Sequence, residues 1–165
     1  LGHRRIAYLS LAPDIEATRL RLAGLKRAFA AAGRPAPDDL LRPGQSQPGP
    51  FKQDEAFAAA RSLLSSAKRP TAIFCGNDEL AMQVYNAAGQ LGIRIPEDLS
   101  IVGFDDHRLF SEGLRPGLTT VSLPYAAMGR LAVGLLLDTR QEFESDRAIR
   151  VKGPLVTRGS TRSIL

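Results

Sequence analysis

Cysteine and histidine are scarce in this sequence, and long apolar runs are absent: its 165 residues include one cysteine and two histidines. One cysteine cannot form a disulfide within the chain, which fits a reducing compartment, and we therefore expect a cytoplasmic protein. No apolar stretch reaches the ~18 residues that a transmembrane helix needs. The first residues also lack the basic, apolar and small-residue pattern of a signal peptide.

The same scarcity argues against common catalytic and metal-binding patterns. Cys75, His3 and His107 are far apart in the sequence and have none of the spacings that hold zinc. Without a nearby base, Cys75 is better interpreted as a small buried hydrophobe than as a nucleophile. The stretch "GQSQPGP" has two prolines and no lysine or serine at the spacing of a phosphate-binding loop. We expect no metal, no cofactor and no enzymatic activity.

Positive charge exceeds negative charge, with 22 basic and 17 acidic residues and a net charge of +5. The basic residues are scattered singly and in pairs, and the aromatic residues do not alternate with them as stacking platforms would. No DNA-docking motif accompanies the charge. The pattern favours a solvated surface over a nucleic-acid-binding face.

Apolar stretches of two kinds alternate along the chain. Short runs predict strands, and stripes with spacings of three and four predict helices. The strands are expected at 4–10, 39–42, 71–75, 99–104 and 118–123, the helices at 16–32, 53–68, 78–91 and 124–138, a short helical segment near 106–113, and extended structure in "AIRVK" and "PLVTR". This alternation predicts an α/β fold with a doubly wound parallel sheet.

Ligands of such sheets bind beyond the carboxyl ends of the strands. The loops expected there are 11–15, 43–51, 76–78 and 105–108. The residues in or next to them that suit a binding site are Arg21, Phe51, Asn77 and Asp105.

Each candidate also has a structural interpretation. Phe51 could be a hydrophobic staple at a helix start, and Arg21 could lie on the surface or act as a forked donor for a ligand oxygen. Asp78 directly precedes a helix, and we expect it to be the cap, which would leave the amide of Asn77 free for hydroxyl groups. Asp105 is expected to face the crevice as an acceptor.

Asp106 is expected to cap the short helix or to lie on the surface. Asp105 and Asp106 could instead be the acid–base pair of a small hydrolase. Adjacent residues that leave a strand point to opposite sides, which argues against a shared proton.

Several segments together resemble a known family. They are "GHRRIAYLS", "RLAGLKRAFAAAG", "RPTAIFCGNDELAMQVYNAAGQLGIRIPEDLSIVGFDD", "RPGLTTVSLP", "MGRLAV" and "PLVTRGSTR". In this order they resemble the lac-repressor and purine-repressor (LacI) family of bacterial transcription regulators.

The resemblance implies an effector-binding domain similar to periplasmic sugar-binding proteins. Two subdomains close over a small effector, and closure alters how a DNA-binding headpiece binds its operator. The family's effector-contacting arginine, stacking aromatic, amide and aspartate fall on Arg21, Phe51, Asn77 and Asp105. The resemblance also implies a homodimer that contacts DNA only through the headpiece.

The headpiece and first subdomain of the family have no counterpart in this sequence. We therefore expect residues 1–123 to form the C-terminal subdomain, residues 124–142 to carry a helix of the N-terminal subdomain, and residues 143–165 to return to the C-terminal subdomain. Because the helix is apolar nearly all round, we expect it to pack across a dimer, swap or be displaced. With half of the cleft missing, effector binding is expected to be weak or absent.

Two departures from the family bear on the ligand. Leu123 replaces a frequent glutamine, and Ile15 and Ala17 replace the arginine and threonine of purine-binding members. A sugar or sugar acid is therefore favoured over a purine. The alternative function is that of a solute-binding domain of a sugar transporter.

Overall fold

The computed structural model describes residues 1–45, 52–137 and 149–165. These residues form a six-stranded sheet with the order β2-β1-β3-β4-β5-β6, in which β6 alone is antiparallel to its neighbour. The strands are β1 (Ile6–Ser10), β2 (Leu41–Pro43), β3 (Ala72–Cys75), β4 (Ser100–Asp105), β5 (Thr119–Ser122) and β6 (Leu155–Val156). The predicted α/β fold with a doubly wound parallel sheet is confirmed, apart from the antiparallel strand β6.

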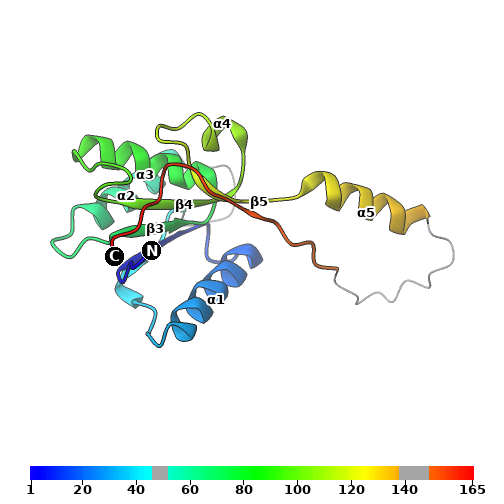
Figure 1. Ribbon diagram of the computed structural model, residues 1–165, viewed down its shortest axis with the longest axis horizontal. Helices are drawn as coiled ribbons and strands as arrows, with labels where there is room; N and C mark the ends of the chain where they lie inside the picture. The colour runs from blue at the N-terminus through cyan, green and yellow to red at the C-terminus, as the bar shows by residue number, and fades with distance from the viewer. Residues whose placement is uncertain (46–51, 138–148) are drawn as a thin grey trace.

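Helices cover both faces of this sheet (Figure 1). Helix α1 lies on one face, and α2, α3 and α4 lie on the other. Their bounds are α1 (Glu16–Ala31), a 3-10 turn η1 (Asp38–Leu40), α2 (Gln53–Leu64), α3 (Asp78–Gln90), α4 (Arg108–Ser111) and α5 (Tyr125–Leu137).

Successive side chains of a strand point to opposite faces of the sheet, so a strand of consecutive apolar residues makes both faces apolar. On β1, Ala7 and Leu9 join the core under α2 and α3, with Ile73 of β3 and Ile101 of β4. The intervening Tyr8 lies on the other face and stacks on Phe74, with their ring centroids 5.2 Å apart. Such two-sided burial is typical of parallel sheets covered by helices.

Helix boundaries follow the expected stop signals, with one exception. Gly33 has a φ of 69° just after α1, and Gly92 has a φ of 68° just after α3, a conformation that favours glycine. The prediction that the second helix reaches residue 68 is wrong, because α2 ends at Leu64. Beyond it, Ser66 Oγ accepts from the Lys68 N–H at 3.2 Å, a local turn that competes with helix.

Helix α5 stands apart from the rest of the molecule (Figure 1). It extends away from the sheet beyond β5, and none of its residues is buried in this chain. Leu136 and Leu137 are 77% and 75% exposed. The apolar side chains that the sequence places on this helix are therefore not buried by any other part of the described residues. None of the helices in the described ranges is both long and apolar enough to cross a membrane.

Candidate functional site

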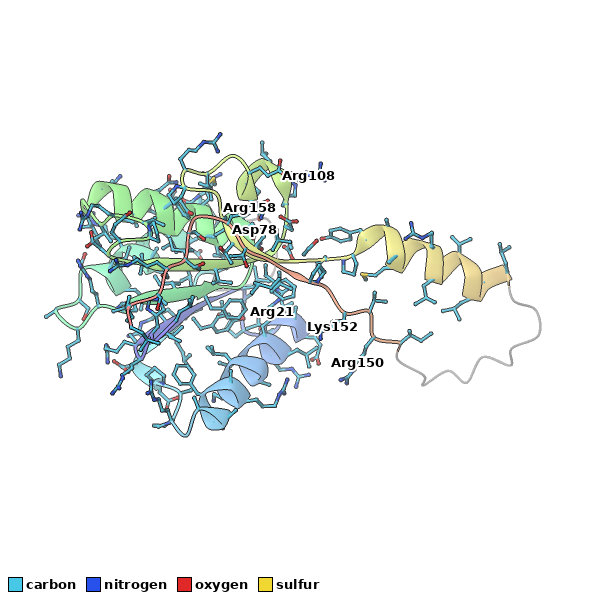
Figure 2. The ribbon with its side chains drawn as sticks, in the orientation of Figure 1. Arg21, Asp78, Arg108, Arg150, Lys152 and Arg158 are labelled. Carbon is cyan, nitrogen blue, oxygen red and sulfur yellow. The ribbon has the colours of Figure 1, made fainter. Side chains whose placement is uncertain are left out.

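The carboxyl ends of β1, β3, β4 and β5 meet at one edge of the sheet, because these strands are parallel. Arg21 of α1 and Asp105 of β4 lie close together there, with Nη2 of the arginine 3.6 Å from Oδ1 of the aspartate. Arg21 is labelled in Figure 2 on the α1 side of the sheet, and Asp78 on the other side. Phe51 lies outside the described residues, so its predicted role stays a prediction.

Arg21 is held at this edge rather than spread on the surface. Its guanidinium carbon lies 3.9 Å from the centroid of the Phe104 ring, a cation–π contact. The side chain is only 14% exposed. The interpretation of Arg21 as a surface residue does not fit this placement, and its role as a forked donor for a ligand oxygen stays a prediction.

Asp105 has an unusual backbone and an unusual environment. It ends β4 with a φ of 108°, in the region that favours glycine. Burial raises the pKa of its carboxyl from 3.8 to about 6, while the positive charge of Arg21 opposes the rise and the charges of Asp78 and Glu79 add to it. The group therefore changes its charge near neutral pH, in a partly buried position.

Asn77, and not Asp78, caps helix α3. Its Oδ1 accepts from the Leu80 N–H at 2.9 Å, and its Nδ2 donates to Oε2 of Glu79 at 3.4 Å. The prediction that Asp78 is the cap is wrong. Since the acceptor of Asn77 is used by the helix, the amide can offer a ligand mainly its N–H groups.

Asp78 is turned inward instead and joins three elements. It is 1% exposed, and its two oxygens accept from the Thr120 hydroxyl at 2.7 Å and from the His107 N–H at 2.8 Å. Burial raises the pKa of Asp78, and these two hydrogen bonds oppose the rise. A Cβ on Gly103 would collide with Oδ1 of Asp78, so only glycine leaves room for the carboxylate.

Asp106 also departs from its predicted role as a cap or surface residue. Its Oδ1 accepts from the Ser111 hydroxyl and from Nη2 of Arg158, both at 2.8 Å. Helix α4 has His107 at its N-cap position without a side-chain cap hydrogen bond. Asp105 and Asp106 thus have separate partners, Arg21 for the first and Arg158 and Ser111 for the second.

A hollow of about 180 Å³ opens beside Asp105. It is lined by Asn77, Asp78, Glu79, Asp105, His107 and Phe110. Sequence reasoning missed Glu79, His107 and Phe110, although each stands within two to five residues of a predicted site residue. Its lining offers acceptor oxygens, an amide donor and an aromatic ring, a combination suited to a small polar ligand.

Tyr125 is a further residue that the sequence did not single out. It begins α5 just beyond β5, at the same edge of the sheet. The pKa of its phenol is raised by burial and then by the negative charge of Asp105. The sequence could have indicated Tyr125, because it is an aromatic residue that follows soon after a strand whose carboxyl end lies at this edge.

Cys75 behaves as expected for a buried apolar side chain. It is fully buried in the core between β3 and the helices, and burial raises the pKa of its thiol. A protonated, inaccessible thiol is a poor nucleophile. Within residues 1–45, 52–137 and 149–165, no group of three or more histidine, cysteine, aspartate or glutamate side chains is placed to hold a metal.

Known proteins resemble the chain over nearly its whole length. Residues 1–161 match the periplasmic binding protein-like domain family. The ribose operon repressor of Escherichia coli is 37% identical over 161 residues, which is 96% of this chain and 47% of that protein. The PurR transcriptional repressor of Vibrio vulnificus is 35% identical over 164 residues, or 99% of this chain and 47% of the repressor.

Solved structures of transcriptional regulators are also similar to this chain in fold and in sequence. A transcriptional regulator from Rhizobium etli has a TM-score of 0.82 and 40% identity, over 97% of this chain and 57% of that one. A complex of the regulator CelR with cellobiose has a TM-score of 0.78 and 32% identity, over 96% and 47% of the two chains. The chain spans about half the length of the curated relatives that it matches.

Proposed function

Since the chain belongs to the LacI family of transcriptional regulators and forms part of the effector-binding domain, we propose that it senses a small sugar for a repressor that binds operator DNA. The observation that carries the proposal is the convergence of Arg21, Asn77 and Asp105 at one edge of the sheet. The chain acts by binding and not by catalysis, like the repressors to which it is similar.

The charges of the hollow favour a neutral sugar over a sugar acid. An anionic ligand would meet Asp78, Glu79 and Asp105, and the nearby cation Arg21 is already paired with Asp105. Hydroxyl groups of a neutral sugar can donate to the carboxylates of Glu79 and Asp105, and carboxylate acceptors form stronger hydrogen bonds than neutral ones. Ile15 and Ala17, in place of polar residues, argue against a purine.

Helix α5 supports a site built from two subdomains. The two connections to this helix run side by side, since the Ser122 N–H donates to the Pro154 carbonyl at 2.9 Å. We assign residues 1–123 and 143–165 to one subdomain, and residues 124–142 to a second one whose core covers the apolar helix. The ligand would lie between the two, and the side-by-side connections would form the hinge.

Signalling would follow from a shift between open and closed forms. A ligand that contacts both subdomains binds the closed form better and raises its population. In a homodimer that carries DNA-binding headpieces, this shift changes the affinity for the operator. Operator binding changes the affinity for the ligand by the same factor, because the coupling free energy between the two sites is reciprocal. Such a regulator works on DNA in the cytoplasm, and the repressors among its relatives favour this role over transport.

Calorimetry on the full-length regulator tests the proposal. Ribose, cellobiose, glucuronate and hypoxanthine would be titrated into the wild type, into Asp105→Ala and into the control Asp98→Ala, whose carboxylate pairs with Arg94 on the surface. We expect a neutral sugar to bind the wild type and the control, and Asp105→Ala to lose at least ~10-fold in affinity, as for a lost charged hydrogen bond. Binding of hypoxanthine or glucuronate alone would contradict the proposal.

A further inference from the structure

The turn at residues 105–107 has a strained backbone. Asp105 and Asp106 are consecutive residues other than glycine, with φ values of 108° and 54°. Each such residue costs on the order of 1–3 kcal/mol and persists only where the surrounding structure enforces it. The contacts that enforce this turn therefore also decide where the Asp105 carboxylate points.

Three sets of hydrogen bonds fix the turn. The Leu123 N–H donates to the Asp105 carbonyl at 3.2 Å, and the His107 N–H donates to Asp78 at 2.8 Å. Between them, the carboxylate of Asp106 is held by Arg158. Asp106 is thus held through its side chain by a residue 52 positions further along the chain.

The guanidinium group of Arg158 donates hydrogen bonds to two partners at once. Nη2 donates to Asp106 and Nη1 donates to the Leu118 carbonyl at 2.9 Å, just ahead of β5. Both side chains of the ion pair are mostly buried, with exposures of 19% for Arg158 and 17% for Asp106. Arg158 does not line the hollow beside Asp105, and its position two residues after β6 places it on the segment that returns from α5 (Figure 2).

We infer that Arg158 is a positioning residue of the effector site: by holding Asp106 it keeps the 105–107 turn in its strained form, so that Asp105 stays beside Arg21. The inference deepens the proposed function and rests on it for the identity of the site. The segment that returns from α5 is thereby tied to the turn that carries the ligand-facing carboxylate. Lysine cannot replace the arginine fully, because one ammonium group cannot reproduce the fork.

The pKa of Asp105 reports the geometry of the turn directly and can be measured in this chain. Carbon-detected NMR titration of the carboxyl groups would follow it in the wild type, where burial holds it near 6. The charged or titratable groups that face it, namely Arg21, Asp78, Glu79, His107 and Tyr125, stay unchanged in the variants.

Arg158→Gln separates positioning from a simple effect of charge. Release of the turn would expose Asp105 to water and lower its pKa by about one pH unit or more, towards the usual value. Loss of a positive charge alone would move the pKa upward. Arg158→Lys should give an intermediate value, and the control Arg94→Gln, which removes a surface pair with Asp98, should leave the pKa of Asp105 unchanged.

A second pair of variants covers the case in which Arg158→Gln does not fold. Asp106→Asn keeps an acceptor oxygen for Arg158 and Ser111 and tolerates the positive φ, so the pKa of Asp105 should stay near that of the wild type. Asp106→Ala removes the acceptor and should lower the pKa of Asp105 as Arg158→Gln does. An unchanged or raised pKa in folded Arg158→Gln or Asp106→Ala would overturn the inference.

Sugar titrations on the full-length regulator separate this inference from the proposed function. If the pKa of Asp105 falls in the variants but no sugar binds the wild type, the positioning role stands and the proposed ligand is wrong. If a sugar binds the wild type and binds Arg158→Gln equally well, with the pKa unchanged, the function stands and the positioning role is wrong. Both ideas together require weaker binding by Arg158→Gln.

Discussion

Replacement of Asp105 by asparagine should make the protein more stable at neutral pH while weakening its binding of effector. The carboxyl is partly buried, with 26% of the side chain exposed, and its pKa in the folded chain is about 6 against 3.8 as its ordinary value. Folding therefore favours the protonated form, and ionisation at neutral pH works against the folded state. Asparagine removes the charge, keeps the shape, and tolerates a positive φ about as well as aspartate.

The size of the effect follows from the linkage between pKa and stability. A rise from 3.8 to about 6 corresponds to about 3 kcal/mol at roughly 1.4 kcal/mol per pH unit, as an upper bound. The contribution of this carboxyl to stability is fully present below pH 3.8 and is lost as the pH rises through about 6. Asp105→Asn should therefore match the wild type near pH 4 and exceed it near pH 8.

Urea unfolding of both proteins at several pH values between 4 and 8 measures this difference. With a slope of about 2 kcal/mol per M, the midpoint of the variant at pH 8 should lie up to about 1.5 M higher. Asp98→Asn is a control of opposite sign, because Arg94 lowers the pKa of Asp98 and its loss should destabilise the chain at neutral pH. The reasoning would be refuted if the difference in free energy of unfolding between Asp105→Asn and the wild type were the same at pH 4 and pH 8. It would also be refuted if the variant were less stable than the wild type at pH 8.

Three further predictions concern stability and association. Asn77→Ala should lower the free energy of unfolding by about 1 kcal/mol through loss of the α3 cap, whereas Asn77→Asp should retain it, as chemical denaturation would measure. Gly103→Ala should destabilise the chain by about 1–3 kcal/mol or more, because the new methyl group meets Asp78 and Leu118, while Gly89→Ala in open space on α3 should be neutral or stabilising. Chain 1–165 should self-associate through its exposed α5, and lysine at Leu136 and Leu137 should reduce the mass seen by light scattering; a wild-type monomer with an ordered, exposed α5 would contradict this.

Much of the fold could be predicted from local patterns. The apolar run 71–75 and the stripe of 78–91 match β3 and α3 within a residue at each end, because buried strands and amphipathic helices impose their own periods on the sequence. The alternation of strands and helices predicted the parallel sheet. The parallel sheet in turn predicted that ligands bind at the edge where the carboxyl ends of the strands lie. Arg21, Asn77 and Asp105 could thus be assigned to one edge before any contact was known.

The roles of individual polar side chains at that edge were harder to predict. The sequence favoured Asp78 as the helix cap because aspartate and asparagine are almost equally good caps and the two are neighbours. Which of them turns inward depends on partners at a distance: His107 is 29 residues from Asp78, and Thr120 is 42 residues away. Asp106 likewise meets Arg158 across 52 residues of sequence.

The sequence alone therefore determined most of the elements, the sheet and the edge at which we propose that a ligand binds, since these depend on neighbours at short, regular spacings. Only the tertiary structure decided that Asn77 caps α3, that Asp78 is buried, and that Asp106 is held by Arg158 while Asp105 faces the hollow. The physical reason is that burial and pairing of a carboxylate depend on donors that distant segments bring together. A pattern of neighbouring residues does not contain that information.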